Sequence, residues 1–80
     1  MEETLARHYA DRLLDFDYYD QIGQDLAGVL LNNAVAVSDA DLGTPGAVAY
    51  LVGKYMRFTK GEGDPRQARV LLERLFERGI

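Results

Sequence analysis

The sequence predicts an all-α protein, a small helical bundle of three main helices plus a C-terminal helix after a Gly-rich Asp-Pro turn. First, apolar residues recur at offsets of three and four along most of the chain, which is the spacing of one helix face. Second, helix start and stop signals agree with this period, most clearly at 64–79. Third, 80 residues with 48% hydrophobic and 28% charged side chains suit one small globular domain.

The first predicted helix spans about residues 3–16, and its apolar stripe consists of Leu5, Ala6, Tyr9, Leu13 and Phe16. Acidic and aromatic residues are interleaved at its end, from 15 to 20. Two interpretations are open for Tyr18 and Tyr19 within that stretch. Either these tyrosines cap the core at a frayed helix end, or they form, with the neighbouring carboxylates, a docking surface for a protein partner.

The second predicted helix spans about residues 21–37 and is apolar almost all round. Such a helix is either buried at the centre of a bundle or finally covered by a partner. Asn32 and Asn33 interrupt the apolar pattern and are candidates for the helix end, because asparagine tolerates the left-handed conformation. Residues 38–46 then form a turn cluster with room for one short helical turn.

The third predicted helix spans residues 47–59, with a buried side made of Ala47, Val48, Leu51, Val52, Tyr55 and Phe58. The opposite arc gathers Gly46, Tyr50, Gly53, Lys54 and Arg57. In one interpretation Lys54 and Arg57 contact a nucleic-acid backbone, and Tyr50 is available to stack on a base. In the other, the two glycines form a notch for packing against another helix, beside solvated cations.

The C-terminal predicted helix spans residues 65–78 and has signals at both ends. Asp64 is placed to cap the first turn, Pro65 suits the first helical position, and Gly79 can end the helix in the left-handed conformation. The preceding turn, 60–64, matches no phosphate-binding motif. Its two acids, Glu62 and Asp64, would repel a phosphate, so we expect a plain connection between helices.

The sequence offers no catalytic constellation. Its one histidine, His8, and its one serine, Ser38, stand in no supporting motif. Cysteine is absent, which excludes disulfides and thiolate zinc sites and leaves the redox compartment undecided. We therefore expect a protein that is not an enzyme, with no cofactor, no metal and no small-molecule substrate.

Nothing in the sequence predicts a membrane protein. The chain opens with an acidic stretch where a secretory signal would be basic, and its longest apolar run, 27–31, is far too short to cross a bilayer. We expect a cytoplasmic protein without membrane association.

Charge is distributed unevenly along the chain, whose net charge is −4. Residues 1–53 hold nine acids and two bases, whereas residues 54–80 hold four acids and seven bases. Such a chain can present a basic face locally while it is acidic overall. Alternatively, the two halves neutralise each other across the fold.

The order of residues in the C-terminal half resembles a known family. Residues 50–65 read YLVGKYMRFTKGEGDP, and paired leucines follow at 71 and 72. This pattern is similar to the tail domain of tRNA-dependent amidotransferase B subunits, which is shared with stand-alone YqeY proteins (the GatB/YqeY tail domain). The resemblance covers residues 33–76. It divides the single domain, 1–80, into acidic N-terminal helices at 1–32 and a tail-domain-like part at 33–80.

The resemblance implies a non-catalytic helical module that holds tRNA. It implies that Lys54, Arg57 and Lys60 meet RNA phosphates, and that Gly53, Gly61 and Pro65 shape the turn. The alternative comes from another class: a small acidic protein-interaction or regulatory adaptor, forming a homodimer or binding a protein partner. That adaptor would use Tyr18 and Tyr19 or the exposed part of the second helix.

Overall fold

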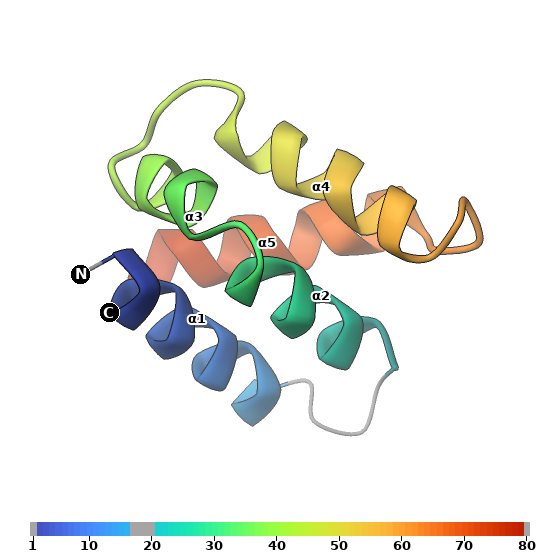
Figure 1. The fold of residues 1–80 in the computed structure, drawn as a ribbon, viewed down its shortest axis with the longest axis horizontal. Coiled ribbons are helices and arrows are strands. Elements are labelled where there is room, and N and C mark those ends of the chain that lie inside the picture. Colours follow the sequence, from blue (N-terminus) through green and yellow to red (C-terminus); the bar gives the residue numbers. More distant parts are fainter. Residues whose placement is uncertain (1, 17–20, 80) are drawn as a thin grey trace.

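The computed structural model describes residues 2–16 and 21–79. These contain no strand and five helices, namely α1 (Glu2–Phe16), α2 (Gln21–Leu31), α3 (Ala34–Asp41), α4 (Ala47–Phe58) and α5 (Pro65–Arg78) (Figure 1). The prediction of an all-α bundle is confirmed. Tyr18 and Tyr19, predicted to bind a partner, lie outside the described residues.

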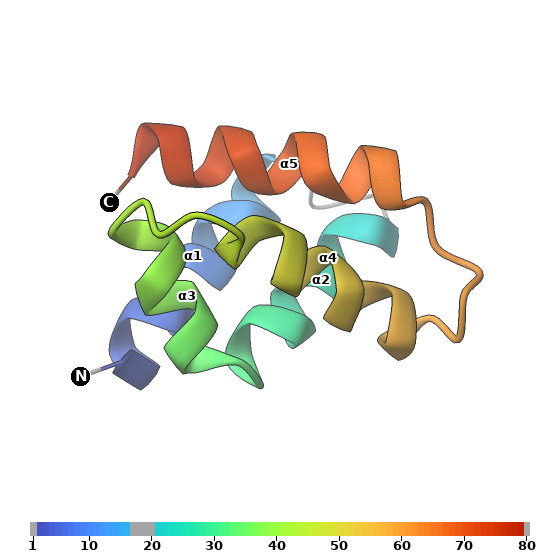
Figure 2. The same ribbon diagram turned by 90° about the horizontal axis from the view of Figure 1, so that it is seen from above.

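The helices form two antiparallel pairs with a short helix between them. α1 packs along α2, α4 packs along α5, and α3 bridges the pairs by contacting both α1 and α4 (Figures 1 and 2). The start of α1 and the end of α5 lie at the same end of the molecule (Figure 2). Short connections thus make neighbours in sequence neighbours in space.

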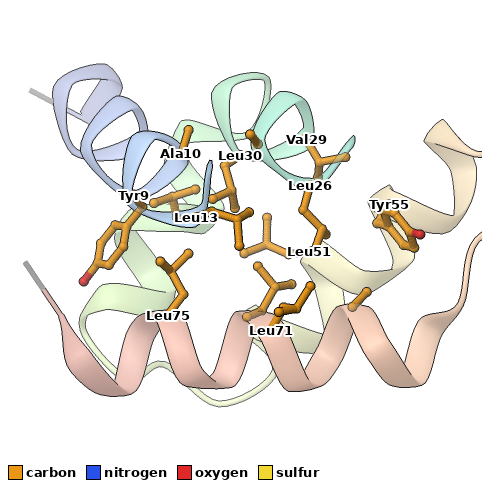
Figure 3. Close-up of a cluster of buried hydrophobic side chains, with 14 of the residues drawn as sticks. Tyr9, Ala10, Leu13, Leu26, Val29, Leu30, Leu51, Tyr55, Leu71 and Leu75 are labelled. Carbon is orange, nitrogen blue, oxygen red and sulfur yellow. The ribbon is translucent and has the colours of Figure 1, made fainter. Parts of the chain in front are cut away.

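All five helices contribute to one apolar core, part of which is drawn in Figure 3. Its largest fully buried side chains are Tyr9, Leu13, Leu26, Leu30, Val37, Leu51, Leu72 and Leu75. No polar or charged residue is buried among the described residues. Burying one such leucine stabilises the fold by about 1.5–3 kcal/mol. Since the described part has no disulfide, this packing supplies the stability.

The second predicted helix ends at Asn32 and Asn33, the positions proposed for its end, and does not continue to 37. The chain leaves helical geometry at Asn33, whose φ is −138° and ψ is 52°. The Asn33 side-chain amide donates a 2.8 Å hydrogen bond to the carbonyl of Val29, so it satisfies one of the carbonyls left open at the end of α2. Because of this break, α2 and α3 bury different sides of what was predicted as one helix. This explains why residues 21–37 are apolar almost all round when they are placed on a single helix.

The buried side of α4 also differs from its prediction at one position. Ala47, Leu51 and Tyr55 are buried, but Phe58 is 52% exposed. The turn that follows α4 folds back onto the Tyr55 ring, so the core is already closed at that point. Phe58 therefore lies outside the core.

The prediction for the C-terminal helix is confirmed at its start, and the helix ends before Gly79 as expected, but Gly79 combines a positive φ with a ψ of −170° and is not in the left-handed helical conformation. The Asp64 carboxylate accepts hydrogen bonds from the backbone N–H groups of Arg66 and Gln67, at 3.0 and 3.2 Å. Pro65 is the first helical residue, and Gly79 follows the last turn with φ of 71°. Of the residues predicted to form the turn, Gly61, Asp64 and Pro65 do so or border it. Gly53 does not, because it lies in the middle of α4.

Local contacts account for the shape of the turn over 59–64. The N–H of Gly61 bonds to the carbonyl of Met56, and the N–H of Lys60 bonds to that of Arg57, which is the Schellman arrangement. Lys60 occupies the left-handed position, with φ of 56°, where glycine is usual. The Thr59 hydroxyl then accepts from the N–H of Gly63 at 3.0 Å.

Candidate nucleic-acid interface

Three of the four residues predicted to bind nucleic acid lie together on α4. Tyr50, Lys54 and Arg57 follow at offsets of four and three, so they stack on one face of the helix. With Gly53 they line a shallow hollow of about 290 Å³. The structure thus brings an aromatic ring and two cations together around Gly53, which has no side chain.

The Lys54 ammonium lies over the Tyr50 ring, 5.3 Å from its centroid. This cation–π contact stabilises the arrangement by about 0.5–1 kcal/mol at an exposed site. It also occupies one face of a ring that is 51% exposed. A base that stacks on Tyr50 therefore meets the other face or displaces the lysine.

Gly53 forms the floor of this hollow. Apart from its two chain neighbours and the backbone of its own helix, a Cβ atom added to Gly53 would meet no described atom within 4 Å. The interpretation of a glycine notch for helix packing is therefore not realised inside the described part of the chain. The surface above Gly53 is open to an external group.

No described acidic side chain forms an ion pair with the cations of this surface. α4 contains two cations and no acid, and the lining of the hollow is free of carboxylates. Over residues 4–15 and 21–79, whose side chains the structure describes, the one ion pair is Arg69 with Glu73, at 3.4 Å within α5. The interpretation that the two halves of the chain neutralise each other by ion pairing is thus not observed for Lys54 and Arg57.

Lys60 lies apart from the other predicted residues. It is in the turn after α4, exposed, and does not line the hollow. Two acids, Glu62 and Asp64, follow it in the same turn. Lys60 therefore adds a cation at the end of α4 rather than inside the hollow.

A larger hollow of about 500 Å³ lies between α3 and the start of α4, lined by Asn32, Asn33, Ala34, Val35, Ala36, Asp39, Thr44, Pro45, Gly46, Ala47 and Tyr50. Tyr50 is the one residue that lines both this hollow and the smaller hollow around Gly53. Sequence reasoning missed this site because it treated residues 38–46 as a turn. The cue available was the apolar residue Val35, which lines the hollow and is 62% exposed.

A third hollow, of about 730 Å³, lies between the start of α2, the end of α4 and the following turn. Its charged lining residues are the acids Asp25, Glu62 and Asp64, and exposed Phe58 forms part of its wall. Because its charge is negative, this hollow repels phosphate groups. A nucleic-acid backbone is therefore expected to bind at one of the other two hollows and not at this one.

The described residues bring no reactive group together. They contain no set of three or more histidines or acids that could hold a metal ion. His8 is exposed on α1, and Ser38 is half-buried on α3. Burial, and then its hydrogen bond to the Asp41 carboxylate, raise the pKa of Tyr9 to about 12.

Among the helices of the described residues, none combines the length and the apolar character that spanning a membrane requires. Comparisons with protein families, with curated proteins and with solved structures found no match for this chain. The surface of α4 and the resemblance of residues 33–76 are therefore the features from which a function can be proposed.

Proposed function

We propose that this protein is a non-catalytic helical module that binds tRNA through its sugar–phosphate backbone. The observation that carries the proposal is the hollow on α4, where Tyr50, Lys54 and Arg57 surround Gly53 without an acidic neighbour. The resemblance to the amidotransferase tail domain adds the class of ligand. A cytoplasmic location follows from that ligand.

The chemistry of the hollow suits a phosphate group. Gly53 lets a bulky ligand approach the helix backbone, and the two cations stand one turn apart beside it. Arginine can form two parallel hydrogen bonds to a phosphate, whereas lysine acts as a point charge. Contacts of this kind position the ligand without reading its sequence.

The proposal is tested by electrophoretic mobility of bulk tRNA at two salt concentrations. We expect binding that weakens with salt, and a double variant, Lys54→Glu with Arg57→Glu, that binds much more weakly. If two phosphate contacts disappear, the slope of log affinity against log salt becomes shallower by about 1.5. Residual binding of the double variant measures what Lys60 and the rest of the surface contribute.

The matched control is Arg74→Glu with Arg78→Glu, which changes the net charge equally at the far end of α5. These arginines are exposed and lie outside the hollow. Retention of tRNA binding in this control, with loss in the α4 variant, supports a local site. Equal effects of both variants, or no binding by the unaltered protein at low salt, would refute the proposal.

A second function is favoured by a different observation. Val35 and Leu42 on the outer side of α3 and its end are 62% and 77% exposed, and Leu31 at the end of α2 is also exposed. An adaptor or homodimer would cover such apolar side chains. Sedimentation would then show a dimer, and Val35→Asp with Leu42→Asp would return it to a monomer. A monomer at high protein concentration excludes the homodimer.

A further inference from the structure

The hollow between α3 and α4 shares a wall with the proposed phosphate site. Tyr50 lines both hollows, and Lys54, which covers one face of its ring, lines only the phosphate side. The ring therefore stands between a cationic surface and a mostly uncharged recess whose one charged lining residue is Asp39. A nucleotide has the same division, with an anionic phosphate beside a flat, mostly apolar base.

The recess has the size and lining of a small-ligand site. Its volume of about 500 Å³ lies within the range of about 300–1,000 Å³ found for such sites. Val35, Ala36 and Pro45 supply apolar surface, and Tyr50 supplies an aromatic ring. Unpaired RNA bases are held in this way, by stacking on aromatic side chains and by hydrogen bonds to their edges.

Asp39 is the one charged residue of the recess. It is half-buried on α3, and its backbone carbonyl accepts a 2.9 Å hydrogen bond from the N–H of Thr44, which fixes the turn beside it. No described cation pairs with its carboxylate. A carboxylate repels phosphate but accepts two hydrogen bonds from adjacent donors. Among the bases, guanine presents two such donors, N1–H and the N2 amine, on one edge.

We infer that the recess between α3 and α4 binds an unpaired guanine of single-stranded RNA. The base stacks on the face of Tyr50 opposite Lys54, and its edge donates to the Asp39 carboxylate. Its phosphate lies above Gly53, between Lys54 and Arg57. This inference rests on the proposed function, and it adds a base preference that phosphate contacts alone do not give.

Fluorescence anisotropy of labelled RNA pentamers tests the inference. The probes are four adenosines around a central guanosine, cytidine or inosine, since inosine lacks the N2 amine. We expect the guanosine pentamer to bind about tenfold more tightly than the cytidine pentamer, with inosine in between. Asp39→Asn should abolish the preference for guanosine over cytidine. Circular dichroism checks that the variant retains its helices.

The outcomes separate the inference from the proposed function. Equal binding of all three pentamers, with loss on Lys54→Glu and Arg57→Glu, overturns the guanine site and keeps the RNA module. A guanine preference that persists in Asp39→Asn also overturns the site. Absence of binding to any RNA at low salt removes both. A dimer that Val35→Asp dissociates would show a second copy in the recess and likewise overturn the inference.

Discussion

The contact between Gly63 and the Tyr55 ring predicts the effect of one added methyl group. A Cβ at Gly63 would lie 2.5 Å from both Cε2 and the hydroxyl oxygen of Tyr55, and 2.6 Å from Cζ. Tyr55 is 3% exposed, so the ring has little room to move away. Gly63 has no positive φ, so its backbone accepts alanine. Replacing Gly63 by alanine therefore has two opposing effects: the contact with the Tyr55 ring destabilises the folded protein, and the loss of backbone freedom in the unfolded chain stabilises it.

The magnitudes decide which effect is larger. Replacing a loop glycine by alanine at a compatible backbone stabilises a protein by about 0.4–1 kcal/mol. Overpacking a core by one methyl group typically costs about 1–3 kcal/mol. We therefore expect Gly63→Ala to lower the free energy of unfolding by about 1–2 kcal/mol. For a domain of this size, each kcal/mol lowers Tm by about 4–8 °C.

Urea denaturation followed by circular dichroism measures this change, and Gly53→Ala is the matched control. Gly53 lies inside α4 with open space above it, so alanine should stabilise the protein by about 0.5–1 kcal/mol. The same substitution at two glycines is thus expected to act in opposite directions. If Gly63→Ala is as stable as the unaltered protein or more so, the Tyr55 ring does not hold the turn as described.

Three further perturbations test the caps and the core. Asp64→Ala removes the two hydrogen bonds to Arg66 and Gln67 and should cost about 1 kcal/mol in urea denaturation, whereas Asp64→Asn should retain most of the stability. Lys60→Gly removes the strain of a non-glycine residue in the left-handed conformation, so it should raise the free energy of unfolding by up to about 1 kcal/mol and raise Tm. A lower Tm would contradict the Schellman geometry. Tyr9 should make stability fall from about pH 10 to about pH 12, by about 1.4 kcal/mol per unit, because the unfolded chain loses that proton first. Tyr9→Phe should show a shallower fall over this range, and identical pH profiles would refute the assignment.

Signals that lie close together in the sequence predict α5 almost completely. Asp64, Pro65 and Gly79 act on backbone groups within a few residues of themselves, so their effect needs no knowledge of the rest of the fold. The grouping of Tyr50, Lys54 and Arg57 is predictable for the same reason, because it depends only on helical periodicity.

Features that depend on packing between distant residues are not predictable in this way. The pair Asn32 and Asn33 signals a helix end, but not that a new helix starts at once and packs on α1. Phe58 has the period of a core residue, and only the return of the turn onto Tyr55 leaves it outside. The recess between α3 and α4 exists because of that unpredicted helix.

Tyr9 has a consequence for how the chain can be divided. From α1, its ring meets Phe76 of α5 at 4.6 Å between centroids, and its hydroxyl reaches Asp41 at the end of α3. A peptide of residues 33–80 would lack this tyrosine, so part of the inner face of α5 would be exposed to solvent. The two pieces, 1–32 and 33–80, should instead reconstitute the bundle when mixed, in the manner of a split reporter.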